Sequence, residues 1–251
     1  MDFEAFSDGE SLLHRLDVRI KLLSAILLIT VLAVSRSYQP ALTGLTIGTV
    51  LVITARLDWR SVAKRLLLVN GFVLFLWITL PLSYPGSPLF SIGPLSFSRD
   101  GVMLAALITI KANGSVLILM ALIATSSIAD LGNGLSRLKV PDSLCMLLLF
   151  SYRYIFVIHQ EYQRLLRAAR LRSFQAGTNF HTYRTFGYLF GMTLVKSLHR
   201  ADRVRQAMIL RGFQGRFYSL NISTIGTQEV CFGVLVAALT GSMVSLELIF
   251  R

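Results

Sequence analysis

The chain of 251 residues is 54% apolar with a mean hydropathy of +0.63, and only 15% of its residues are charged. So few charged side chains cannot cover a water-soluble domain of this size, which excludes an ordinary soluble protein and indicates an integral membrane protein. The net charge is +12, and residues 137–216 hold fourteen Lys and Arg against three acids. A basic segment beside membrane spans marks the cytoplasmic side more often than a nucleic-acid interface, so we expect no nucleic-acid partner.

Five apolar segments are candidates for membrane-crossing helices, each of which needs about 20 residues. In chain order they are Ile20–Ser35, Pro40–Ala55, Leu66–Leu82, Gly101–Ile128 and Val230–Phe250. The first two are short, which a bilayer accommodates by local thinning or by contact with neighbouring helices. Between the third and fourth, Leu89–Phe97 is either a short hairpin or a re-entrant piece, because Pro, Gly and Ser surround it.

Basic residues concentrate in alternate loops. Those before the first span and after the second are Arg15, Arg19, Lys21, Arg56, Arg60, Lys64 and Arg65. The loop after the fourth span holds residues 137–216, whereas the two other loops hold only Arg36 and Arg99. This alternation predicts a multi-pass protein with a cytoplasmic N-terminus. We therefore expect an all-α integral membrane protein with a membrane region of about four spans (1–129), a cytoplasmic helical region (130–227) and a C-terminal transmembrane helix (228–251).

The cytoplasmic region reads as two amphipathic helices. Pro141 is expected in the first turn of the first helix, with Asp142 close to its positive end. Further along, Arg164, Arg167 and Arg170 form a basic stripe opposite an apolar one. In the second helix the basic arc consists of Lys196, Arg200, Arg203 and Arg211, and the apolar face is interrupted by Arg205.

Both helices are expected to end in nearly the same sequence, "ARLRSFQAG" at 169–177 and "AMILRGFQG" at 207–215. The residues of interest are Leu171, Arg172, Ser173, Leu210, Arg211 and Gly212. One interpretation is a helix stop, in which a small residue adopts a left-handed turn and a cation lies near unpaired carbonyls. The other is a docking tip, in which each arginine makes bidentate bonds to a carboxylate of a partner.

These motifs, together with "LHRLDVRIKLL" (13–23), "LKVPDSL" (138–144) and "YRYI" (152–155), resemble the transmembrane T component of energy-coupling factor transporters, the EcfT/CbiQ family. The resemblance covers Leu12 to Phe217. It makes Asp17, Arg19, Lys21, Pro141 and Arg153 candidates for structural or partner contacts. Asp17 in particular suggests an ion pair that ties the N-terminus to the basic helices.

The resemblance implies a non-catalytic coupling subunit of an ABC importer in the bacterial cytoplasmic (inner) membrane. In that family an Ala-Arg-Ser or Ala-Arg-Gly motif on each cytoplasmic coupling helix docks into one of two ATP-binding cassette ATPases, which bind ATP and Mg. Here Leu171 and Leu210 replace the alanines. The chain is most similar to the cobalt and nickel branch that serves cobalamin biosynthesis, in which a separate CbiM-like membrane subunit captures the substrate. A T component for a vitamin is the alternative.

The remaining polar residues do not form a recognisable catalytic or metal-binding pattern. Lys111, inside the fourth predicted span, either locks helices together or contacts the substrate-binding partner. The four histidines are scattered, and neither they nor the two cysteines form a metal-ligand pattern, so we expect no metal site and no cofactor in this chain. No phosphate loop or catalytic motif occurs, so we expect no enzyme. A self-contained channel or secondary transporter whose basic helices bind anionic lipid is the remaining alternative.

Overall fold

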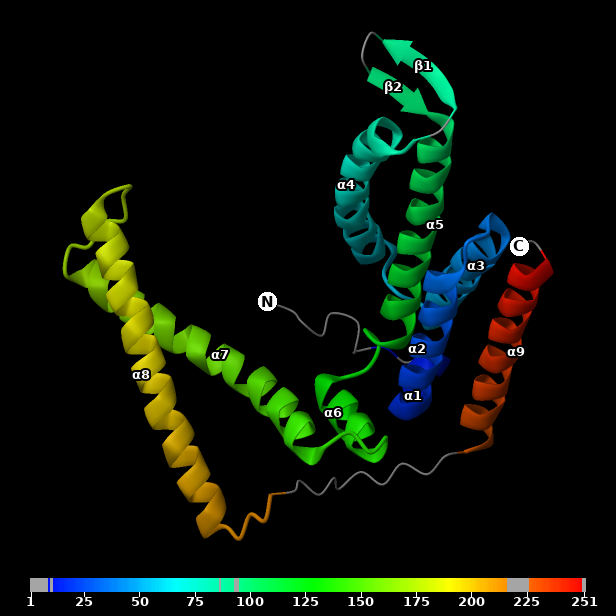
Figure 1. Ribbon diagram of the computed structural model, residues 1–251. Helices are drawn as coiled ribbons and strands as arrows, with labels where there is room; N and C mark the ends of the chain where they lie inside the picture. The colour runs from blue at the N-terminus through cyan, green and yellow to red at the C-terminus, as the bar shows by residue number, and fades with distance from the viewer. Residues whose placement is uncertain (1–8, 10, 86, 93–94, 216–225, 250–251) are drawn as a thin grey trace. The chain divides into compact units, whose positions relative to one another are not determined.

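The computed structural model describes residues 9, 11–85, 87–92, 95–215 and 226–249. Within these residues the backbone forms nine helices and one two-stranded hairpin (Figure 1). The chain divides into two compact units, residues 1–134 with 222–251, and residues 135–221. The predicted helical fold class is confirmed. Two predicted stretches, residues 216–225 of the cytoplasmic region and Phe250 of the last span, lie outside the described residues.

The first unit contains most of the elements. They are α1 (Leu12–Arg15), α2 (Val18–Val34), α3 (Tyr38–Ala55), α4 (Trp59–Ser83), β1 (Pro88–Ile92), β2 (Leu95–Ser98), α5 (Arg99–Leu122) and α9 (Thr227–Ile249). Helix α6 (Ile128–Arg137) begins in this unit and ends in the second. Strands β1 and β2 pair antiparallel, so the predicted alternative of a hairpin between the third and fourth spans is confirmed, apart from residues 93–94, which lie outside the described part.

Five helices are long and apolar enough to cross a membrane, judged by length and composition among the described residues: α3, α4, α5, α7 (Asp142–Leu171) and α9. The predicted number of five is confirmed, but the membership differs. Helix α2, the first predicted span, has 17 residues and packs against α5 and α9. Helix α7, predicted to be a cytoplasmic amphipathic helix, is 30 residues long and contains a stretch that is apolar enough to cross a membrane.

Polar caps set the helix boundaries. The carboxylate of Asp17 accepts from the backbone N–H of Arg19 at the start of α2. Helix α5 ends at Leu122, six residues earlier than predicted, because a new helix starts just beyond it. There the hydroxyl of Ser127 accepts from the backbone N–H of Asp130 at 3.1 Å and donates to its carboxylate at 2.6 Å. Ser127 is therefore the N-cap residue from which α6 begins.

The core of the first unit lies between α2, α3, α5 and α9. Its innermost side chains, all with no exposed surface, include Leu28, Leu32, Ile118 and Met243. Helices α3 and α5 approach closely because both carry glycine at the contact: a Cβ on Gly48 would lie 3.1 Å from the carbonyl oxygen of Gly114. Gly48 of α3 therefore serves packing inside the chain.

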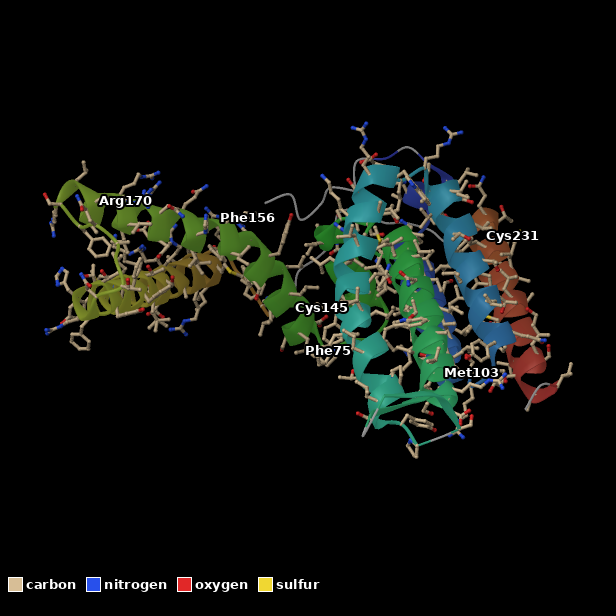
Figure 2. The ribbon with its side chains drawn as sticks, turned by 90° about the horizontal axis from the view of Figure 1, so that it is seen from above. Phe75, Met103, Cys145, Phe156, Arg170 and Cys231 are labelled. Carbon is tan, nitrogen blue, oxygen red and sulfur yellow. The ribbon has the colours of Figure 1, made fainter. Side chains whose placement is uncertain are left out.

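The second unit is a hairpin of two long helices, α7 and α8 (Phe180–Leu210). In Figure 2, Cys145, Phe156 and Arg170 mark positions in chain order along α7, and α8 runs back beside it. Aromatic rings hold the two helices together near the connecting loop. Tyr162 stacks on Phe190 with ring centroids 5.2 Å apart, and Phe174 meets Phe186 edge-on at 5.7 Å. Since α8 has 31 residues, it is about 46 Å long.

Candidate functional site

The end of α7 is closed by a cap in which Arg172 is the last residue with near-helical backbone angles, φ −92° and ψ 26°. Ser173 follows with a positive φ of 62°. The N–H of Ser173 donates to the carbonyl of Arg170, and the N–H of Phe174 donates to that of Ala169 at 3.1 Å. This pair of backbone hydrogen bonds around a left-handed residue is a Schellman motif.

The end of α8 repeats this arrangement at every position. Arg211 has φ −89° and ψ 10°, and Gly212 follows with φ 77°. The N–H of Gly212 donates to the carbonyl of Ile209 at 2.9 Å, and the N–H of Phe213 to that of Met208 at 3.0 Å. The small residue of each motif therefore occupies the position that needs a positive φ, where a side chain is unfavourable. We call residues 171–175 and 210–214, which read Leu-Arg-Ser-Phe-Gln and Leu-Arg-Gly-Phe-Gln, the two tips.

The cap by itself is a helix stop. The end of α6 has the same backbone pattern, with Lys139 at φ 65° and the N–H of Val140 donating to the carbonyl of Leu135. What distinguishes the tips is their repeated sequence and the surface they present. Leu171 is 88% exposed and Leu210 is 87% exposed, and the arginine that follows each of them is exposed as well. The tips lie at the two ends of α8, because Arg172 is in the loop before its start and Arg211 follows its last residue.

One carboxylate joins the two helices between the tips. Glu161 of α7 accepts from Nζ of Lys196 on α8 at 2.6 Å, and Nη2 of Arg200 lies 3.9 Å from its other oxygen. Arg164 of α7 adds a third cation at 3.6 Å. The Glu161 side chain is only 13% exposed, so this ion pair is shielded more than a surface pair. The predicted basic arc of α8 therefore faces an acid of α7 at two of its positions.

A groove lies between the N-terminal half of α7 and the C-terminal half of α8, with a volume of about 660 Å³. Its lining is mainly apolar and includes Met146, Leu147, Tyr154, Leu198, Val204 and Met208. Arg205, which interrupts the predicted apolar face of α8, also lines this groove.

The N-terminal candidates Asp17, Arg19 and Lys21 gather at the start of α2. Nε of Arg19 lies 3.7 Å from the Asp17 carboxylate, so these neighbours form a local ion pair. Lys21 is 1% exposed, and its Nζ donates to the hydroxyl of Ser126 at 3.1 Å. This contact ties the start of α2 to the turn between α5 and α6, a pairing that the charge pattern alone does not indicate.

Lys111 acts as a helix clamp. Its Nζ donates to the carbonyl oxygens of Ala33 and Ser35 at the end of α2, where a cation complements unpaired carbonyls. Across the α2–α3 turn, the carboxylate of Glu247 on α9 accepts from the backbone N–H of Arg36 at 2.8 Å. Sequence reasoning missed Glu247, although an acid inside a predicted span was the signal that could have revealed it. The helix-locking interpretation of Lys111 is the one these contacts favour.

Two further candidates lie on α7. Pro141 is its N-cap residue, one position before the first turn in which it was expected, and its carbonyl accepts from the N–H of Leu144. The Arg153 guanidinium lies 5.8 Å from the centroid of the Tyr154 ring, an exposed cation–π contact. Arg153 is nineteen residues before Arg172, so it belongs to the body of the helix and not to the tip. Within the described residues, no group of three or more His, Cys, Asp or Glu side chains could hold a metal ion.

Comparison with known proteins places the chain in one family. The family described as "Cobalt transport protein", CbiQ, matches residues 9–220. The energy-coupling factor transporter transmembrane protein EcfT of Bacillus subtilis (strain 168) is 27% identical over 220 residues, which is 82% of each chain. The cobalt transport protein CbiQ of Rhodobacter capsulatus is 30% identical over 135 residues, 53% of this chain and 55% of its own. The chain therefore belongs to the EcfT/CbiQ family of transmembrane proteins of energy-coupling factor transporters.

Proposed function

We propose that this chain is the coupling subunit of an ATP-driven importer. It binds two ATP-binding cassette ATPases through its two tips and transmits their movement to a substrate-binding membrane subunit. The observation that carries the proposal is the pair of tips: five-residue sequences that differ only at Ser173 and Gly212, with the same cap and the same exposure, end both helices of one hairpin. Membership in a family of transporter membrane subunits supports it.

The tips suit this task because each arginine is exposed at the end of a long, supported helix. A guanidinium forms two parallel hydrogen bonds to a carboxylate, which fixes direction as well as distance. Since α8 is about 46 Å long and joined to α7 by Glu161, a push on one tip displaces the whole hairpin rather than bending a loop. The hairpin couples the ATPases to the substrate-binding subunit only if these partners bind its position with ATP and its position without ATP with different affinities.

We place the α7–α8 hairpin on the cytoplasmic side, with the N-terminus of the chain on the same side. By length and composition α7 could span a bilayer, whereas α8 is not among the helices that could. The ion pairs of Glu161 with Lys196 and Arg200 lie midway along the hairpin, and three charges at that depth are costly inside hydrocarbon. The positive charge of residues 137–216 favours the cytoplasm for the same segment.

The substrate we propose is cobalt or nickel, captured by a CbiM-like partner and not by this chain. Support comes from the family's description and from the Rhodobacter relative, which is named a cobalt transport protein. ATP and Mg are bound by the ATPases, so this subunit needs no cofactor of its own. Uptake of radiolabelled cobalt and nickel by cells that carry this gene and its neighbours tests the substrate. Uptake of a vitamin instead of either metal would contradict it.

Co-purification tests the docking role. The full chain is solubilised in detergent with the ATPases encoded beside it, and wild type is compared with the Arg172→Glu/Arg211→Glu double variant. We expect the ATPases to be retained by wild type and lost from the variant, because each substitution turns an attraction for a carboxylate into a repulsion. Arg167→Glu/Arg203→Glu, which changes two exposed arginines on the bodies of α7 and α8 and alters the net charge equally, is the matched control. Equal retention by both proteins would refute docking through the tips. If no ATPase is retained by wild type, the lipid-binding channel becomes the better account.

A further inference from the structure

Leu171 and Leu210 are the two most exposed large apolar side chains among the described residues, at 88% and 87%. A single exposed leucine is ordinary on a protein surface. These two occupy the same position of a repeated sequence, each directly before an exposed arginine at a helix end. Surface composition alone does not account for two large apolar side chains at equivalent positions of two helix ends.

The fold of the hairpin does not explain these leucines. A side chain that is almost nine-tenths exposed buries little apolar surface, so it adds little to the stability of α7 or α8. Alanine at the same position is the better helix former. Alanine is also the residue that the resemblance implies at the first position of both motifs. The three extra carbon atoms of each leucine are therefore available to a partner.

We propose that Leu171 and Leu210 are apolar anchors of the two tips, each filling a hydrophobic pocket of an ATPase subunit beside the carboxylate that binds the following arginine. This inference rests on the proposed function and specifies the surface that the ATPase presents. The leucine contacts an apolar part of that surface, and the arginine next to it contacts an acidic part. Buried anchors of this kind carry most of the energy of an interface.

The equivalence of the two tips adds a condition on the partner. Because both have the same sequence apart from Ser173 and Gly212, and the same capped backbone, one surface accommodates either of them. The ATPase pair therefore presents the same pocket twice. Engagement of both tips by one ATPase pair also makes the second contact intramolecular, so the double interface binds more tightly than either half.

The test compares Leu171→Ala, Leu210→Ala and the double variant with wild type in the complete detergent-solubilised complex. The rate at which the ATPase dissociates from the immobilised chain is measured at low and at high salt. Losing three buried carbons raises the dissociation constant by about tenfold or more at each tip. The free energy gained by burying a leucine does not fall with ionic strength, whereas that of an exposed ion pair does, so the loss of affinity persists at high salt. Leu194→Ala, at a position on α8 that is 63% exposed, is the matched control.

The anchors are supported if the ATPase dissociates faster from the leucine-to-alanine variants, while Leu194→Ala and Leu171→Met/Leu210→Met release it at the wild-type rate. Dissociation of Leu171→Ala/Leu210→Ala at the wild-type rate overturns them. In that event, continued loss of binding in Arg172→Glu/Arg211→Glu shows that the arginines dock alone and leaves the proposed function standing. Failure of wild type to retain any ATPase overturns the proposed function and the anchors together.

Discussion

Replacing Glu161 by glutamine tests whether one carboxylate holds α7 and α8 together. The bond from Nζ of Lys196 is 2.6 Å long and charge-assisted, so it is the strongest of the contacts that Glu161 makes. Arg164 and Arg200 lie farther away, and all three cations are partly exposed, Lys196 by 41%, so solvent screens each pair. Glutamine can still accept a hydrogen bond but carries no charge, so we expect a loss no larger than that of an exposed ion pair.

Hydrogen exchange on the full chain in detergent measures this loss locally. A loss of that size corresponds to at most about fivefold faster exchange wherever amides exchange through opening of the hairpin. We expect the effect in peptides around Glu161 and around Lys196, and little change in α2, α3 and α5, which lie in the other unit. Asp202→Asn removes an exposed acid from α8 and serves as the control for net charge. Unchanged exchange in Glu161→Gln would show that the aromatic contacts alone hold the helices together.

Gly212→Ala is expected to destabilise the end of α8 by about 1 kcal/mol because φ is 77° there, whereas Ser173→Gly is expected to stabilise the end of α7 by a similar amount. Hydrogen exchange of the phenylalanine amide that follows each position measures the two changes in stability. Changes in the same direction would contradict the left-handed cap. Lys111→Met removes the donor to two carbonyls at the end of α2 and is expected to lower the free energy of unfolding by about 2 kcal/mol. The loss is measured as a lower melting temperature of the chain in detergent. An unchanged melting temperature would refute the contact between Lys111 and α2. Gly48→Val is expected to destabilise the chain by about 1–3 kcal/mol because even a Cβ would lie 3.0 Å from a side chain of α5. Gly71→Ala, with open space around it inside α4, is expected not to lower the melting temperature, since alanine is the better helix former. Equal melting temperatures of the two variants would contradict the close helix contact.

Much of the fold is readable from local patterns. Apolar runs of span length and the basic, amphipathic 137–216 segment predict the long helices, and the duplicated Leu-Arg-small sequence predicts two equivalent helix ends. The glycine at 212 indicates the left-handed cap residue directly. Serine carries no such signal, so the positive φ of Ser173 follows only from its position in the repeat.

The remaining features depend on contacts between residues far apart in the chain. Lys111 meets the end of α2 across 78 and 76 positions, and Lys196 meets Glu161 across 35. A sequence shows that each residue is charged but not which partner the packing brings to it. The end of α5 differs from the prediction for another reason: Leu122 lies inside an apolar run, and hydropathy does not register the Ser127 cap that starts α6.

A distance measurement between the α7–α8 hairpin and the first unit tests the coupling role most directly. His199 on α8 and Arg60 on α4 are exposed and lie outside both tips, so spin labels there leave the proposed contacts intact once Cys145 and Cys231 are replaced. The labelled chain is assembled with its ATPases and substrate-binding subunit, and the distance distribution is recorded without nucleotide and with ATP trapped. We predict a clear shift of the distribution when ATP binds. An identical distribution in a complex that hydrolyses ATP and transports its substrate would contradict the account.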